Sequence, residues 1–287
     1  MGNLPQLLLA IIVMSTSGVL ARSIDISPEL VIWVRCMIAA AALYIVLKVL
    51  KLPLWTGKGK ALWIVAFSTI FFGIHWITYF YALHFSTVAI GMLSLFTYPV
   101  FTAILEPIIT RSRLKPVDII LSIVAFSGVY FLVPTFDLTN QVTQGVILGI
   151  LSAVAYSLRN IMLKLHVQEH SGITLMFMQV VGLSVFLSPF LVIGGLSLNL
   201  ELISNHWIPI LILGLFTTAI GHTLFVASFK NFSITVISIL STLTPLIGIF
   251  LGYFFLNEIP EGNVWVGGVL ISIAVVVESF KTAKKSD

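Results

Sequence analysis

The sequence predicts an all-α integral membrane protein with ten transmembrane helices, which form two inverted repeats of five helices. Three observations lead to this prediction. Hydrophobic residues make up 59% of the 287 residues and charged residues only 9%, and a soluble domain could not keep such a surface in water. Ten apolar stretches have the length that a bilayer requires. Segments of the third and eighth stretches also resemble each other in sequence.

A transmembrane helix needs about 17–25 predominantly apolar residues. The ten stretches cover residues 4–21, 29–47, 61–83, 87–110, 117–134, 144–164, 172–193, 207–229, 234–256 and 263–280. The breaks between them contain charged, Gly, Pro or small polar residues. The first stretch lacks a basic leader and a cleavage site with small residues, so we interpret it as a helix and not as a signal peptide. The single cysteine, Cys36, excludes an internal disulfide and is expected to be a packing residue.

Lys and Arg residues gather on one side of the predicted bundle. If the ten helices alternate in direction, the side with the C-terminus holds twelve of the fifteen Lys and Arg residues. The other side holds only Arg22, and Arg35 and Arg159 lie within the stretches. Positive residues mark the cytoplasmic side, so we expect a multi-pass protein of the plasma (inner) membrane with both termini in the cytoplasm. The net charge of +4 therefore indicates topology and not a nucleic-acid partner.

The two halves of the chain share a repeated segment. Residues 75–97 and 222–244 match at seven of 23 positions when shifted by 147, and residues 27–35 resemble residues 171–179 at a shift of 144. The matches pair His75 with His222, Phe85 with Phe232, Ser86 with Ser233, Ile90 with Ile237, Leu93 with Leu240, Ser94 with Ser241 and Thr97 with Thr244. Copies that lie five helices apart are inverted in the membrane, as in many secondary transporters. We place the first repeat at residues 1–137 and the second at residues 138–287, within one structural unit.

With these features, the chain resembles the drug/metabolite transporter superfamily, in its EamA-like branch of ten helices. The resemblance rests on the two five-helix repeats and on particular residues: Arg35 in the second helix, Pro99 and Pro245 in the fourth and ninth, Asn257-Glu258 after the ninth, and Gly267-Gly268 in the tenth. The chain departs from the pattern at Arg111-Ser112-Arg113, where an acidic residue is expected. The resemblance implies transport of a small metabolite by alternating access and leaves the substrate open.

Polar and aromatic side chains recur on single faces of several predicted helices. Such polar groups are costly in lipid and usually face a cavity or a neighbouring helix. We expect a substrate cavity lined by His75, Trp76, Tyr79, Ser94, Tyr98, Tyr156, Asn160, His222, Phe225 and Ser241. The alternatives are close helix packing for the serines and neutral, hydrogen-bonded imidazoles for the histidines. Two histidines without Cys or carboxylate neighbours at ligand spacing do not predict a metal site.

Glu106 and Arg159 have opposite charges, and each lies about one turn from the cytoplasmic end of its predicted helix. We expect them to pair as a cytoplasmic gate or coupling site that breaks when the cavity opens inward. The alternative is that each side chain extends separately to the lipid headgroups. Arg35 lies near the outer end of the second helix, where we expect its side chain to reach the headgroups in the same way.

Pro99 and Pro245 occupy equivalent positions in the two repeats, near the middle of the fourth and ninth stretches. A proline within a helix removes a hydrogen bond and bends the helix. The two prolines are therefore candidate hinges, and a fixed bend is the alternative.

The function that the sequence predicts is secondary transport of a small metabolite, such as an amino acid or another small polar or amphipathic compound, with export favoured. No phosphate-binding loop is present, so we expect neither ATP as the direct energy source nor a cofactor. The expected partners are the substrate and the bilayer; the sequence leaves open a co-transported proton, a counter-substrate, and a monomer or dimer. A lipid flippase is the alternative. An enzyme is not expected, because the chain has no His-Glu-x-x-His or Gly-x-Ser-x-Gly motif.

Overall fold

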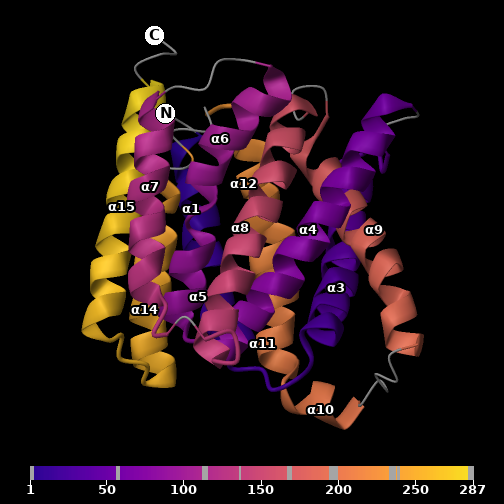
Figure 1. Cartoon of the computed structure of the whole chain (residues 1–287). Helices are drawn as coiled ribbons and strands as arrows, with labels where there is room; N and C mark the ends of the chain where they lie inside the picture. Colours follow the sequence, from indigo (N-terminus) through magenta and orange to yellow (C-terminus); the bar gives the residue numbers. More distant parts are fainter. Residues whose placement is uncertain are drawn as a thin grey trace.

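The computed structural model of the chain describes residues 3–55, 59–111, 116–135, 137–166, 170–193, 200–232, 237 and 240–283. These residues are predominantly helical, and no strand occurs among them. The first half holds α1 (Leu4–Ser15), α2 (Ser17–Arg22), α3 (Pro28–Val49), α4 (Lys60–Phe85), α5 (Val88–Leu95), α6 (Tyr98–Thr110) and α7 (Pro116–Leu132). The second half holds α8 (Gln141–His166), α9 (Gly172–Ile193), α10 (Leu200–Asn205), α11 (Trp207–Ile212), the π-helix η1 (Leu213–His222), α12 (Thr223–Ser228), α14 (Leu243–Leu256) and α15 (Gly262–Ala283). In Figure 1 the long helices run side by side as one bundle.

Seven helical segments of the described residues are long and apolar enough to cross a membrane. They are Leu4–Arg22, Pro28–Val49, Ala61–Phe85, Val88–Thr110, Gln141–Lys164, Gly172–Pro189 and Trp207–Ser228. Three shorter apolar helices, Ile119–Leu132, Leu243–Leu256 and Gly262–Val277, lie in the remaining three stretches that the sequence predicts. Each predicted stretch therefore contains an apolar helix, while helix length alone supports seven crossings.

The two candidate hinge prolines each lie in the first turn of a helix. α5 ends at Leu95 and α6 begins at Tyr98, so Pro99 is the second residue of α6. Similarly, a turn at Thr242 precedes α14, and Pro245 is its third residue. Proline is compatible with this position because the first N–H groups of a helix have no acceptor within the helix. The expectation that these prolines bend continuous helices is thus corrected: they start a new helical segment after an interruption.

α6 and α14 also end in the same way. Arg111 and Asn257, which lie 146 positions apart, both adopt the left-handed backbone conformation, with φ angles of 56° and 54°. Their N–H groups donate to the carbonyls of Pro107 and Gly252 respectively. This conformation is uncommon for residues other than glycine, although Lys51 after α3 also adopts it. The two helix ends therefore share a local conformation at equivalent positions.

Helices of the first half pack mainly on helices of the second half. The most extensive contacts join α4 to α8, α7 to α15 and α3 to α9, and further contacts join η1 to both α1 and α3. The larger of two apolar clusters includes residues from α1, α3, α4, α8, α9 and η1, and the smaller one includes residues from α5, α7 and α15. The two halves therefore enclose a common core.

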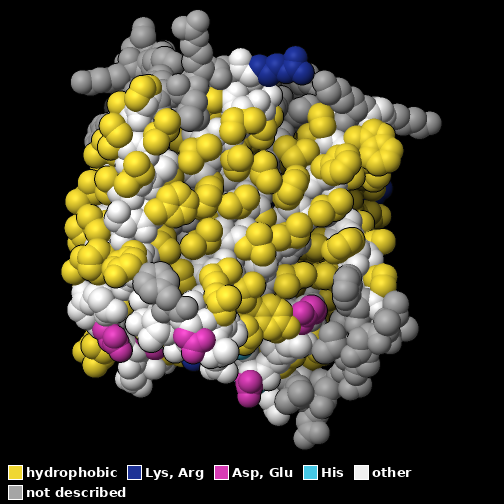
Figure 2. All heavy atoms as spheres, viewed as in Figure 1, with side chains coloured by type: hydrophobic (Ala, Val, Ile, Leu, Met, Phe, Trp, Pro, Cys, Tyr) yellow, Lys and Arg dark blue, Asp and Glu magenta, His cyan; other side chains and the backbone are white. Residues whose placement is uncertain are grey.

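The outer surface of the bundle carries a band of apolar side chains. Large hydrophobic residues such as Phe250, Phe255 and Val185 are exposed on it. On the face drawn in Figure 2, hydrophobic side chains cover the middle, Lys and Arg lie at the upper edge, and Asp and Glu lie towards the lower edge. Such a surface suits a lipid environment with a basic and an acidic side.

Candidate functional site

A cavity lies between the two halves, near the middle of the bundle. Its volume is 40 Å³, enough for a few water molecules. It is lined by Ile11, Met14, Ser17, Arg35, His75, Trp76, Tyr79, Phe80, Met92, Leu95, Phe96, Tyr98, Tyr156, His222, Phe225, Ser241 and Thr244. Apart from the half-buried Met14 and Ser17, all of these residues are buried. The cavity is therefore small and lined by buried side chains, and it must widen to admit a larger guest.

Eight of the ten residues expected in the cavity line it; Ser94 and Asn160 do not. Ser94 packs against Gly149 of α8, where a Cβ atom on the glycine would lie 2.4 Å from that of Ser94. Ser94 thus follows the alternative of close helix packing. Asn160 instead accepts a hydrogen bond of 3.1 Å from Nη1 of Arg159.

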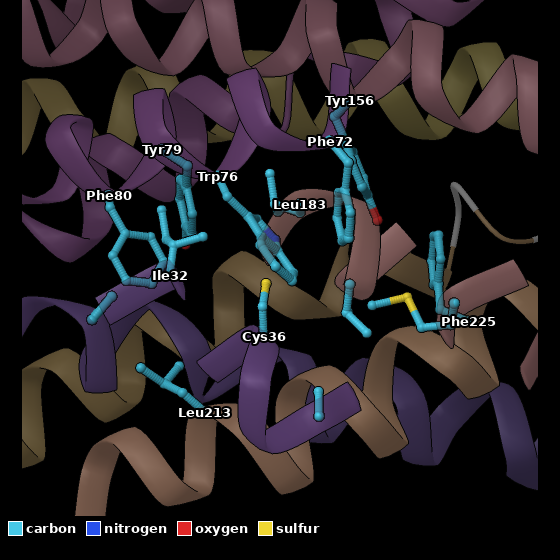
Figure 3. Close-up of a cluster of buried hydrophobic side chains, with 14 of the residues drawn as sticks. Ile32, Cys36, Phe72, Trp76, Tyr79, Phe80, Tyr156, Leu183, Leu213 and Phe225 are labelled. Carbon is cyan, nitrogen blue, oxygen red and sulfur yellow. The ribbon is translucent and has the colours of Figure 1, made fainter. Parts of the chain in front are cut away.

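Two arginines and two aromatic rings form a continuous stack through the core, which we call the arginine–aromatic stack (Arg35, Trp76, Phe72 and Arg159). The guanidinium carbon of Arg35 lies 4.0 Å from the ring centre of Trp76, and that of Arg159 lies 4.2 Å from the ring centre of Phe72. The centres of the two rings, which are neighbours on α4, are 4.0 Å apart. In Figure 3, Tyr79, Trp76 and Phe72 follow one another along α4, and Tyr156 lies beyond Phe72. Cation–π contact thus accompanies the burial of both charges.

Arg35 does not extend to the headgroups, so this expectation from the sequence is wrong. Its side chain is 1% exposed and donates to the hydroxyl oxygens of Thr218, at 2.9 Å, and Thr217, at 3.3 Å. Both hydroxyls donate in turn to the carbonyl of Leu213 in the π-helix η1. Gly214 permits the close approach of α3, because a Cβ there would lie 2.8 Å from Ile38. These neighbours turn Arg35 inward.

Arg159 also lies in the core, and its expected partner is replaced by another residue. Its side chain is fully buried, and Nη2 donates to Oε1 of Gln179 at 2.7 Å. Gln179 is held in place by its own bond to Ser68, at 3.0 Å. Gln179 aligns with Arg35 at the shift of 144. Arg35 on α3 and Gln179 on α9 therefore occupy equivalent positions in the two halves. Arg35 carries a guanidinium group itself, whereas Gln179 binds the guanidinium group of Arg159 from α8.

The expected ion pair between Glu106 and Arg159 is not formed among the described residues. Glu106 is half-buried near the end of α6, and the basic group that acts on it is Lys164. Lys164 Nζ also donates to the carbonyls of Phe229, at 3.3 Å, and Phe232, at 2.9 Å. The predicted pair was wrong because Arg159 lies deeper in the bundle than its distance along the chain from the end of α8 suggests.

The two histidines that match in the repeat have different surroundings. Nδ1 of His75 lies 2.7 Å from the hydroxyl of Ser152, which donates to the His75 carbonyl at 2.9 Å. Since a hydroxyl has one hydrogen, which Ser152 donates to the carbonyl, we assign Nδ1 of His75 as the donor to the Ser152 oxygen. The ring of His222 meets Phe72 and Trp76 edge-on, and its Nδ1 has no hydrogen-bond partner among the described residues.

A polar cluster joins the two halves at the end of the bundle opposite Lys164. Arg22 and Glu258 were both identified from the sequence, but it did not predict that they meet. Glu258 forms an ion pair with Arg22 at 3.5 Å and accepts a hydrogen bond of 2.7 Å from the backbone N–H of Val88, at the start of α5. Burial raises the pKa of Glu258, while the Val88 N–H and Arg22 act in the opposite direction. We call this cluster the outer clasp (Arg22, Val88 and Glu258). The sequence signal for it was two opposite charges on the same predicted side.

Comparison with known proteins adds a family and a fold. The model of the EamA-like transporter family matches residues 4–133 and 143–280. An uncharacterized transporter of Synechocystis sp., sll1164, is 25% identical over 65% of this chain and 57% of its own length. Uncharacterized transporters of Archaeoglobus fulgidus and Clostridium kluyveri are 24% and 23% identical, over 70% and 67% of this chain and 70% and 63% of their own lengths. A solved crystal structure shares the fold, with a TM-score of 0.71 over 100% of this chain and 99% of that one, at 14% identity.

Proposed function

The chain belongs to the EamA-like transporter family, and we propose that it is a secondary transporter that moves a small metabolite across the plasma membrane by alternating access. The observation that carries this proposal is the central cavity between the two halves, because both halves contribute to its walls. A site enclosed between two repeats can open to either side when the repeats rock against each other.

We further propose that ten helices cross the membrane as two inverted repeats. The packing supports this, since the main contacts have counterparts five spans later in the chain. α4 on α8 corresponds to η1 on α1, and α3 on η1 corresponds to α9 on α4. The matching left-handed ends at Arg111 and Asn257 agree with the same symmetry. With basic residues on the cytoplasmic side, both termini lie in the cytoplasm in this proposal.

Two polar connections supply candidate closures at opposite ends of the cavity. The outer clasp ties α2 and α5 to the segment after α14. At the proposed cytoplasmic end, Lys164 ties α8 to the chain after α12, close to Glu106. We propose that these connections break alternately, so that Glu106 acts in the cytoplasmic gate with Lys164. Arg159 remains within the core.

The flippase alternative has less support. The larger grooves, of 270 and 590 Å³, lie between α14 and α15 and are lined almost wholly by apolar residues. Neither shares a lining residue with the central cavity. A lipid headgroup needs a polar path, and these grooves do not offer one. We therefore favour a soluble metabolite as the substrate. Export remains the proposed direction from the sequence, and the grooves do not bear on it.

Counterflow tests the proposal. Sealed proteoliposomes with purified protein would be loaded with one unlabelled metabolite at a time and diluted into the same labelled compound. We expect transient accumulation of label for at least one metabolite class, and no accumulation after the vesicles are permeabilised. Chemical conversion of the compound by the protein in detergent would contradict transport, and scrambling of labelled lipid without counterflow would favour the flippase.

A further inference from the structure

The arginine–aromatic stack buries two positive charges that no carboxylate balances among the described residues. Arg35 and Arg159 are 1% and 0% exposed, and neither forms an ion pair in the part of the chain that the structure describes. Their hydrogen-bond partners are the neutral side chains of Thr217, Thr218, Asn160, Gln179 and Met176. A buried charge without a counter-charge is costly, and an ionised residue at membrane depth usually marks a functional site.

The cavity shows where a counter-charge could bind. Arg35 lines it, while no Asp or Glu of the described residues does. Ser241 Oγ and His222 Nδ1 have no hydrogen-bond partner in the described part of the chain. Both residues line the cavity, so these atoms are available to polar atoms of a guest. An anion beside Arg35 would form charge-assisted hydrogen bonds with its guanidinium group.

The same walls disfavour a cationic guest. A cation could bind over an aromatic ring, but Arg35 already lies 4.0 Å from the ring centre of Trp76. A second cation would meet the repulsion of Arg35 and Arg159 without an acidic partner among the described lining residues. Other rings of the lining, among them Tyr79, Tyr98, Tyr156 and Phe225, present apolar surfaces suited to a flat, uncharged body.

We propose that the cavity binds a small organic monoanion, whose carboxylate contacts Arg35 and whose flat apolar body lies between the aromatic rings. This inference rests on the proposed transport function, because it names the substrate class of the same cavity. Arg35 recognises the charge by direct contact. Arg159, which lies behind Phe72 and does not line the cavity, adds to the positive potential.

Three probes with the same ring and different charge test the proposal: benzoate, benzamide and benzylamine. Binding to the purified full-length protein in detergent would be measured by titration calorimetry. We expect benzoate to bind at least about tenfold more tightly than either neutral benzamide or cationic benzylamine. Equal or tighter binding of benzamide or benzylamine would overturn the proposal, and so would the absence of benzoate binding up to its solubility limit.

Variants of Arg35 locate the contact. We expect Arg35→Gln to weaken benzoate binding at least about tenfold and to leave benzamide binding nearly unchanged, while Arg35→Lys restores part of the benzoate affinity. Lys230→Gln removes one positive charge from an exposed surface position and serves as the matched control. Thermal unfolding would confirm that each variant is folded. If Arg35→Gln binds benzoate as tightly as Lys230→Gln does, Arg35 is not the anion site.

Counterflow separates failure of this inference from failure of the proposed function. If proteoliposomes accumulate a cationic or neutral compound and reject benzoate, the protein is a transporter and the proposed substrate class is wrong. If no probe or metabolite accumulates, while benzoate still binds through Arg35, the anion site stands and the transport function is wrong.

Discussion

The guanidinium group of Arg35 lies 4.0 Å from the ring centre of Trp76, inside the bundle and at the wall of the central cavity. The ring covers the cation, and the cation occupies one face of the ring. The Thr217 and Thr218 hydroxyls complete the surroundings of Arg35 from η1. Helices α3, α4 and η1 therefore meet at one contact, which couples core packing to the chemistry of the cavity.

We expect Trp76→Ala to lower the free energy of unfolding by about 3 kcal/mol, because it removes a large buried ring and leaves a cavity beside a buried charge. The side chain of Trp76 is 2% exposed. Unfolding could be followed by reaction of a thiol dye with the single buried cysteine, Cys36. Trp63→Ala is the matched control, since Trp63 is 66% exposed on α4. Equal losses in both variants would show that the stack does not stabilise the core.

Gly149→Ala should destabilise the protein by about 1–3 kcal/mol, because α8 and α5 then no longer fit together. A Cβ at this position would meet that of Ser94 at 2.4 Å. The exchange variant Ser94→Gly with Gly149→Ala should recover most of the loss, because the methyl group then takes the space of the serine side chain. Gly262→Ala is the control, because a Cβ added to Gly262 would have no other atom within 4 Å. A double variant no more stable than Gly149→Ala would refute this packing account.

The third prediction concerns the effect of the buried Arg159 charge on stability. Gln179→Leu removes its 2.7 Å hydrogen bond and should cost about 2–3 kcal/mol, because a buried charge then loses a partner. Adding Arg159→Met removes the charge, so the double variant should be more stable than Gln179→Leu alone. Denaturation in mixed micelles would compare the three proteins. The account of an uncompensated charge fails if the double variant is the least stable of them.

The outer clasp predicts a dependence of stability on pH. Burial raises the pKa of Glu258 above its value in the unfolded chain, so the folded state binds this proton more tightly. The stability that comes from this group is complete at acidic pH and is lost as pH rises through the folded pKa. Comparison of wild type with Glu258→Gln across the acidic to neutral range isolates this contribution. The wild-type protein should lose stability relative to the variant as pH rises, and the opposite slope would show that the ionised form is favoured.

Much of the cavity could be predicted from the sequence, because its polar and aromatic residues share single helical faces. His75, Trp76 and Tyr79 were found in this way. The role of Arg35 could not be predicted, since its inward turn depends on two threonines brought together by the π-helix η1. The partner of Arg159 depends likewise on α4, which packs against both α8 and α9. Helical periodicity predicts which residues share one face of a helix, whereas tertiary packing determines which side chains contact each other.

The central claim is that the cavity opens alternately to the two sides of the membrane, and thiol accessibility at Ser241 tests it without knowledge of the substrate. Ser241 lines the cavity and is 3% exposed. In a Cys36→Ser background, Ser241→Cys would be treated with a membrane-impermeant thiol reagent from one side of oriented vesicles and then from the other. Lys230→Cys, at an exposed position, reports the orientation.

We predict that the Ser241→Cys thiol reacts from either side, in both cases more slowly than a surface thiol, while the Lys230→Cys thiol reacts from one side only. Reaction at position 241 from a single side, or from neither, would contradict alternating access through this cavity.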